Sequence, residues 1–182
     1  MEFNLVERAQ RGDAEAFQAL VHECADRLYA IAHRILREPD RAEDALQQAL
    51  IRIWEDLPGL RDPAKFDAWT YRLVVHASYR EAKRERRWTS RVREITVEPA
   101  ESDCTQTVID RDELDRAFRR LTPEHRAVLV LRFFIGQPID EVAETLGIPV
   151  GTAGSRLHYA VRSLRAASEA EARGVIAWRT TA

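Results

Sequence analysis

The stretch from Pro138 to Arg165, PIDEVAETLGIPVGTAGSRLHYAVRSLR, predicts two short helices joined by a tight turn. Apolar residues of its first half have the i, i+3, i+4 and i+7 spacing of one buried helical face: Ile139, Val142, Ala143 and Leu146. Gly147 ends this helix, and Pro149 stands where a new helix can begin, because its missing N–H costs nothing in a first turn. An apolar stripe follows in the second half, at Leu157, Val161 and Leu164. The stretch therefore predicts a helix-turn-helix, whose second helix can enter the major groove of DNA.

The rest of the chain also has helical periodicity, and no segment shows the alternation typical of a strand. We therefore predict an all-α fold of two small helical domains joined by a flexible acidic linker, because residues 89–109 lose all periodicity. The expected boundaries are 1–88 for the first domain, 89–109 for the linker, 110–168 for the second domain and 169–182 for a C-terminal tail. We expect the tail to pack on the second domain through its apolar residues, Val175, Ile176 and Trp178.

Helix-start and helix-stop residues place several helix ends in the first domain. Asp13 is expected to cap the second helix, after a short first one. Pro39 is expected to end that second helix, and Asp40 with Glu43 resembles a capping box at the start of the third. A long helix is expected over residues 65–87, and its second half is almost purely basic.

The chain has 182 residues, of which 45% are hydrophobic, enough to form a packed core. Its formal net charge of -2 hides a strong segregation of charge. Residues 80–93 carry seven basic and two acidic side chains, a net +5, whereas residues 98–115 carry one basic and seven acidic side chains, a net -6. A basic block that runs into an acidic one indicates two different partners, or two surfaces of one large partner.

Several classes of function have no motif in this sequence. The histidines show no paired metal-ligand spacing and no glycine-rich phosphate loop is present, so we expect no catalytic activity, no cofactor and no metal. No apolar run reaches the roughly 18 residues that cross a bilayer, and the N-terminus lacks the apolar core of a secretion signal, so we expect a cytoplasmic protein. Cys24 and Cys104 lie far apart and are expected to be reduced and structural.

Two helical domains, a basic helix at the end of the first, an acidic linker and a C-terminal helix-turn-helix together resemble the extracytoplasmic-function (ECF) sigma factors of bacterial RNA polymerase. The resemblance covers nearly the whole chain. Its most specific motifs are AEDALQQALIRIWEDL (42–57), FDAWTYRL (66–73) and LTPEHRAVLVLRF (121–133), followed by the helix-turn-helix. It implies a protein that is not an enzyme, but directs core polymerase to specific promoters and helps to melt DNA.

The resemblance implies that the helix over residues 42–57 docks on the coiled coil of the largest polymerase subunit. Three polar residues match positions of this contact, and two apolar residues lie beside them: Asp44, Gln47, Gln48, Ile51 and Trp54. From the residues alone, the polar side chains could equally form a solvated helix face.

The resemblance also implies a site for the -10 promoter element, which family members read as a melted single strand. Such a site needs aromatic or planar groups for unstacked bases and cations for the backbone. The candidates are Asp62, Lys65, Phe66, His76, Tyr79, Arg80, Lys83, Arg84 and Arg87. His76 and Arg80 stand where the family usually has Asn and Asp, so the family's base preference does not carry over to this chain. Trp69 and Tyr71 are expected in the core, because aromatic residues at helical spacing usually pack.

A third site implied by the resemblance is the second helix of the helix-turn-helix, which would read the -35 element as duplex. The candidates are Thr152, Ser155, Arg156, His158, Tyr159 and Arg162. Arg156 and Arg162 could bond guanine edges or phosphates, or they could only pair with acidic neighbours. The family usually has a Lys where this chain has Gly154, so we expect weak phosphate contact and a helix that binds weakly alone.

The acidic linker matches the family pattern of a segment that threads polymerase channels later occupied by RNA, although its residues alone also fit a solvated connector. Family members are usually held inactive by an anti-sigma factor, so the resemblance implies such a partner beside core polymerase and promoter DNA. One competing interpretation is a dimeric helical repressor or activator that binds duplex DNA through the same helix-turn-helix. It leaves the basic helix and the pattern from Asp44 to Gln48 unexplained. An adaptor that binds a regulatory protein without touching DNA has still less support.

Overall fold

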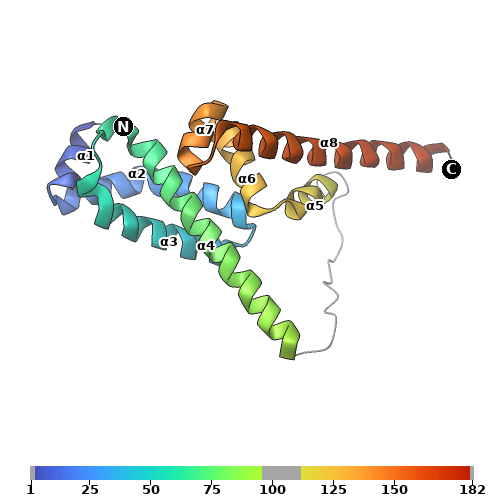
Figure 1. Cartoon of the computed structure of the whole chain (residues 1–182), viewed down its shortest axis with the longest axis horizontal. Coiled ribbons are helices and arrows are strands. Elements are labelled where there is room, and N and C mark those ends of the chain that lie inside the picture. Colours follow the sequence, from blue (N-terminus) through green and yellow to red (C-terminus); the bar gives the residue numbers. More distant parts are fainter. Residues whose placement is uncertain (1–2, 96–111, 181–182) are drawn as a thin grey trace.

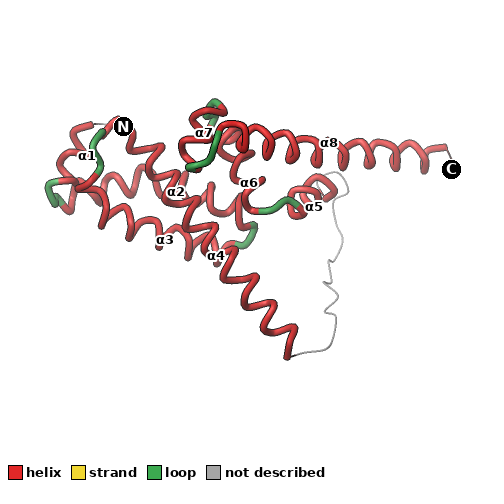
Figure 2. The backbone as a smooth tube through the Cα atoms, in the orientation of Figure 1, coloured by secondary structure: helices red, strands yellow, loops and turns green. Residues whose placement is uncertain are grey.

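A computed structural model of the chain describes the backbone of residues 3–95 and 112–180 and the side chains of residues 4–88 and 116–166. Every regular element in these ranges is helical, as the red tube in Figure 2 shows. The predicted all-α fold is therefore confirmed. Cys104 and most of the predicted linker lie outside the described residues.

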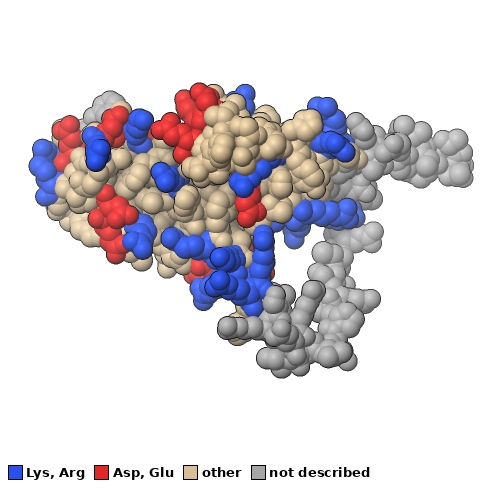
Figure 3. All heavy atoms as spheres, in the orientation of Figure 1, with Lys and Arg blue, Asp and Glu red and all other residues tan. Residues whose placement is uncertain are grey.

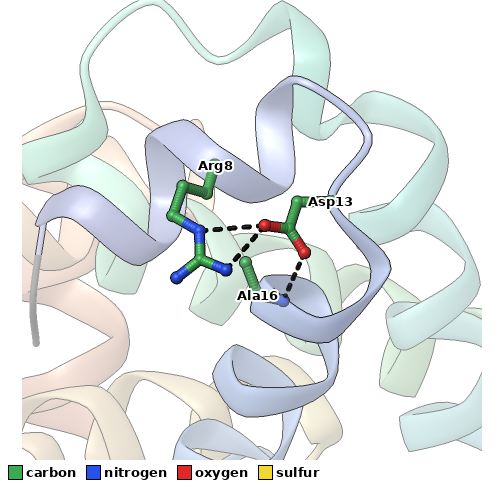
Figure 4. A network of polar contacts seen from close by, with 3 residues as sticks. All are labelled: Arg8, Asp13 and Ala16. Carbon is green, nitrogen blue, oxygen red and sulfur yellow. Dashed lines mark hydrogen bonds and ion pairs between the residues drawn. The ribbon is translucent and has the colours of Figure 1, made fainter.

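The first half of the molecule is a bundle of helices in which α4 is the longest (Figure 1). Its described elements are α1 (Phe3–Gln10), α2 (Ala14–Leu36), α3 (Pro39–Asp56), the 3-10 turns η1 (Leu57–Gly59) and η2 (Pro63–Lys65), and α4 (Phe66–Ile95). Asp13 caps α2, as predicted: its carboxylate accepts a hydrogen bond from the Ala16 N–H at 3.0 Å and pairs with Arg8 at 2.7 Å (Figure 4). These contacts, that with Ala16 first, hold the pKa of Asp13 below its usual value.

The junction between α2 and α3 differs from the prediction. α2 already ends at Leu36, where Arg37 takes a left-handed conformation with φ of 67°. Pro39 is in the first turn of α3, so it begins a helix rather than ending one, because the first turn has no use for its missing N–H. The capping box predicted at Asp40 and Glu43 is therefore wrong. At the other end of this half, α4 runs on to residue 95, so the predicted linker begins as helix.

Apolar side chains of α2, α3 and α4 form the core of the first half. The largest of those that are fully buried are Phe66, Leu20, Leu28, Ile31, Ile35, Ile53, Val74 and Val75. Tyr71 is buried, as predicted, and its hydroxyl accepts a hydrogen bond from Arg27 Nη1 at 3.0 Å. Trp69 is half-buried and packs against the core. Cys24 is buried with a free thiol, as predicted, and burial raises its pKa to about 11.

The second half contains the helix-turn-helix. Its described elements are α5 (Asp112–Arg120), α6 (Pro123–Leu129), the π-helical segment η3 (Val130–Ile135), α7 (Ile139–Leu146) and α8 (Val150–Thr180). α7 ends at Gly147, whose φ of 66° lies in the left-handed region that glycine adopts without strain. The predicted helix-turn-helix is therefore present, and α8 continues it as one long helix (Figure 1). The residues predicted to anchor the tail lie outside the described side chains: Val175, Ile176 and Trp178.

The two halves share one apolar core. Side chains from α6, η3 and α7 belong to the same buried cluster as those of the first half: Ala127, Val128, Val130, Leu131, Val142 and Leu146. A second, smaller cluster lies between α5, α6 and α8. The helix-turn-helix is therefore packed against the bundle in this structure, and not held by the linker alone.

Polar contacts cross the same junction. The Arg126 guanidinium of α6 donates a hydrogen bond to the carbonyl oxygen of Ile35, at the end of α2. Arg34 of α2 lies over the ring of Phe134, 3.8 Å from its centroid, which is cation–π geometry. These contacts fix the orientation of the second half on the end of α2.

Candidate nucleic-acid and partner interfaces

A groove with a volume of about 720 Å³ lies between α3 and the second half of α4. It is lined by Arg41, Asp44, Arg80, Glu81, Lys83, Arg84, Glu85, Arg87 and Trp88. Five cations face three carboxylates, so the lining carries a net positive charge. Figure 3 shows basic side chains gathered over this part of α4, at the lower centre of the view. Such a groove attracts the phosphates of a nucleic acid.

Acidic side chains hold two of these cations in place. Arg41 of α3 pairs with Glu38 at 3.1 Å and also with Glu85 of α4. Arg84 lies 3.7 Å from the carboxylate of Glu81. No ion pair joins the three other cations to a described side chain: Arg80, Lys83 and Arg87.

Glu81 is a buried carboxylate at the contact between α3 and α4. It is 5% exposed, and its Oε1 accepts a hydrogen bond from Gln48 Nε2 at 2.7 Å. A buried charge is costly unless it is paired and hydrogen-bonded, and here Gln48 and Arg84 supply both. Gln48, predicted to contact polymerase, therefore already has a structural partner within the chain.

Two -10 candidates in the middle of α4 differ in exposure. His76 is exposed at the surface of α4. Its pKa lies below the usual value, first because its ring is partly removed from water and then because the positive charges of Arg72 and Arg80 are close. Tyr79 is half-buried, and its hydroxyl is shielded from water with no hydrogen-bond partner among the described residues. Burial first, and then Glu124 of α6, raise the pKa of Tyr79. Tyr79 therefore faces the second half of the molecule.

The predicted -10 residues near the start of α4 are partly occupied by structural contacts. The Asp62 carboxylate accepts a hydrogen bond from the Ala64 N–H at 3.0 Å and so caps η2. Lys65 is exposed and pairs with Glu144 of α7 at 3.4 Å. Phe66 is only 2% exposed, because α4 begins there and its first apolar side chain packs into the bundle. In this structure Phe66 is a core residue, contrary to the prediction that it contacts DNA.

The predicted polymerase face is the outer surface of α3. Asp44 and Gln47 are exposed, while Gln48 is held by Glu81. Ile51 and Trp54 are large apolar side chains that are 56% and 46% exposed. The Trp54 ring meets the edge of Phe17 with centroids 4.6 Å apart, which fixes its position at the surface. The face combines acidic, amide and apolar groups, which suits a protein partner better than DNA.

The predicted -35 residues lie in the first four turns of α8. Ser155, His158, Tyr159 and Arg162 are exposed, whereas Thr152 and Arg156 are half-buried. The hydroxyl of Ser155 donates to the Thr152 carbonyl oxygen at 3.0 Å. Neither Arg156 nor Arg162 makes an ion pair with a described carboxylate. The alternative that these arginines only pair with acidic neighbours therefore has no support among the described residues.

One ring contact and one charge interaction link the start of α8 to α6. Tyr159 lies against the His125 ring of α6, with centroids 4.7 Å apart. Burial raises the pKa of Glu124, but hydrogen bonds with Thr122 and the backbone, together with the charges of Arg86 and Arg156, lower it below its usual value. The start of α8 is therefore positioned by α6, which itself packs on the first half.

Four groove residues were not among the predicted site residues: Arg41, Glu81, Glu85 and Trp88. Trp88 follows the basic run of α4 directly, so its place in the sequence was a usable signal. Arg41 and Glu81 become part of the site only through the packing of α3 on α4, which periodicity does not specify.

The described residues contain neither a candidate metal site nor a candidate membrane-spanning helix. No group of three or more His, Cys, Asp or Glu side chains there could hold a metal ion. None of the described helices has a stretch that is both long and apolar enough to cross a membrane.

A helix-turn-helix packed on a helical bundle with a basic groove defines a bipartite DNA-binding protein. Comparisons with known proteins specify the class further. The Sigma-70 region 2 family matches residues 20–88, and the Sigma-70, region 4 family matches residues 117–166. The ECF RNA polymerase sigma factor SigL of Mycobacterium tuberculosis is 33% identical over 164 residues, which cover 88% of this chain and 93% of that protein. SigW of Bacillus subtilis, another ECF sigma factor, is 24% identical over 173 residues, 88% of this chain and 92% of that protein.

Two solved structures share the fold. The sigma factor RpoE from Bartonella quintana, in complex with the anti-sigma factor NepR, matches with a TM-score of 0.68 at 20% identity, over 86% of this chain and 98% of that one. CnrH, in complex with the cytosolic domain of CnrY, matches with a TM-score of 0.64 at 23% identity, over 92% of this chain and 97% of that one. The chain belongs to the ECF family of RNA polymerase sigma factors.

Proposed function

We propose that this sigma factor uses three surfaces: the outer face of α3 for core polymerase, α4 with its basic groove for the -10 element as single strand, and the start of α8 for the -35 element as duplex. The first two adjoin at Asp44, which lines the groove. The observation that carries this proposal is the separation of a net-positive groove from an exposed helix-turn-helix, in the parts that match regions 2 and 4. The chain acts as a non-enzymatic initiation subunit, in the cytoplasm where polymerase and chromosome meet.

Transcription with purified components tests the function itself. Core polymerase is incubated with the full-length protein and with fragments of the genome that encodes it, and transcript 5′ ends are mapped. We expect new starts that share upstream sequence elements and that are absent with core polymerase alone. No protein-dependent start on any fragment would contradict the function.

Paired variants test the division of labour between α4 and α8. We expect R84A/R87A to reduce open-complex formation more than duplex binding, and R156A/R162A to reduce duplex binding more. Each lost phosphate contact should lower the slope of log affinity against log salt by roughly 0.7 to 0.9. The full chain is used because the two halves share a core. Equal losses by both pairs in both assays would contradict the assignment.

We also propose an anti-sigma factor as a regulatory partner. The support is that RpoE, which shares this fold, was solved in complex with one. Such a partner would compete with core polymerase for the face around Ile51 and Trp54, which are exposed apolar side chains. I51D should weaken the binding of both core polymerase and the anti-sigma factor. If I51D left the binding of both partners unchanged, that result would contradict a shared face.

A further inference from the structure

Trp88 is an exposed aromatic side chain at the rim of the basic groove. Its exposed fraction of 72% is the highest among the large apolar side chains that the structure describes as exposed. A tryptophan left in water forgoes the favourable burial of its apolar surface. An aromatic ring among cations is the composition of surfaces that bind unpaired bases without strong sequence preference.

The helix geometry aligns this ring with the cations of the groove. Trp88 follows Arg84 by one helical turn and Arg80 by two, so the three residues lie along one face of α4. At a rise of about 1.5 Å per residue, Trp88 is about 6 Å beyond Arg84 along the helix axis. A strand that tracks the basic face of α4 would therefore reach Trp88 after passing the predicted -10 residues.

The charges of the groove favour a nucleic acid over an acidic protein segment. Acidic side chains hold Arg41 and Arg84, but no ion pair joins Arg80, Lys83 or Arg87 to a described side chain. An acidic peptide would satisfy the cations but would offer no regular flat partner to the indole. Duplex DNA would offer phosphates, but its bases are already stacked on one another. A single strand supplies both a free base face and closely spaced phosphates.

We propose that the groove between α3 and α4 binds single-stranded DNA, with one unpaired base stacked on Trp88 and the adjoining phosphates held by Lys83, Arg84 and Arg87. This inference rests on the proposed function and adds Trp88 to it as a base-binding residue. Trp88 is exposed while the two halves are packed together, so the free chain can be tested directly.

The probe is a fluorescein-labelled (dT)12, chosen because it forms no internal pairs, and binding to the full-length chain is followed by anisotropy at several salt concentrations. We expect W88A to weaken binding roughly 5- to 100-fold, the range of one base–aromatic stack. W88F should stay near wild type, because it keeps an aromatic face. The salt slope should stay unchanged in W88A, since no cation is lost, but fall by roughly 0.7 in K83A.

F133A is the matched control, because Phe133 is also a highly exposed aromatic residue, 66% exposed, but lies in η3 outside the groove. It should leave (dT)12 binding unchanged. The inference would be overturned if W88A bound (dT)12 as tightly as wild type does. It would also be overturned if the matching duplex bound as tightly as (dT)12 and depended on Trp88 to the same extent. A W88A variant that lost polymerase binding but kept (dT)12 binding would overturn it as well. Failure of wild type to bind (dT)12 would also overturn it. The transcription assay reports separately on the proposed function, which stands if only these (dT)12 results fail.

Discussion

Two tyrosines of α4 differ in the surroundings of their hydroxyl groups. The Tyr71 hydroxyl accepts a hydrogen bond from Arg27 at 3.0 Å, whereas the Tyr79 hydroxyl is buried without a partner among the described residues. A buried polar group without a hydrogen bond costs about 1–3 kcal/mol, while a satisfied one contributes about 1 kcal/mol. We therefore expect Y79F to raise the free energy of unfolding by up to about 2 kcal/mol, and Y71F to lower it by about 1 kcal/mol.

Urea denaturation followed by circular dichroism measures both changes. Y71F is the control, because it removes the same atom from the same helix. Destabilisation of similar size in both variants would show that the Tyr79 hydroxyl has a partner in solution, such as an ordered water.

Glu81 offers a second test with individual side chains. Its carboxylate links α3 to α4 through the 2.7 Å hydrogen bond from Gln48. We expect E81A to lower the free energy of unfolding by about 1–3 kcal/mol, because it leaves the amide of Gln48 and the guanidinium of Arg84 without their acceptor. In a double-mutant cycle with Q48A, the coupling energy should be about 1 kcal/mol. Additive effects would mean that the hydrogen bond contributes nothing in solution.

At the scale of elements, two of the three glycines of the helix-turn-helix, Gly147 and Gly154, should respond in opposite directions to alanine. Gly154 lies inside α8, and a Cβ there would meet nothing within 4 Å. G154A should stabilise the protein by roughly 0.5–1 kcal/mol, because it removes freedom from the unfolded chain. Gly147 has φ of 66°, so G147A should destabilise by about 1 kcal/mol or more. Thermal unfolding measures both, and stabilisation by G147A would contradict the turn conformation described.

The helix-turn-helix could be read from sequence because its signals are local. Apolar spacing defines the buried face of α7, and Gly147 ends it through its own conformation. The predicted start of α3 was wrong because the sequence offers two helix-start patterns there. Pro39 occupies the first turn of α3, whereas the predicted capping box would begin one residue later. Element type was therefore more predictable than element ends.

The candidate site was less predictable, because periodicity shows that a face is buried but not what covers it. Phe66 was predicted to contact the -10 element, yet it packs into the bundle as the first residue of α4. Gln48 and Glu81 are 33 residues apart, and only the packing of α3 on α4 joins them. Burial of Tyr79 depends on the second half of the chain, which no pattern within α4 contains.

For the whole molecule, the shared core has a functional consequence. Tyr79, a -10 candidate, faces the second half, and the -35 candidate Arg156 lies near Glu124 of α6 in the same region. A DNA strand cannot reach Tyr79 while the halves are packed together. Promoter binding through the Tyr79 hydroxyl therefore requires the halves to separate, whereas Trp88 is exposed while they are packed together.

Arg126 is the side chain with which this separation can be tested, because its guanidinium crosses the junction to the carbonyl oxygen of Ile35. We expect R126A to weaken the packed arrangement by about 1.4 kcal/mol, which raises the separated fraction roughly tenfold while that fraction is small. Small-angle X-ray scattering should then give a larger radius of gyration, and apparent affinity for promoter DNA should rise in proportion to the separated fraction. R132A is the control, since Arg132 donates to the Gln137 carbonyl oxygen at 3.1 Å within the second half. An unchanged radius and affinity in R126A, or equal changes in R132A, would show that the junction does not limit access to DNA.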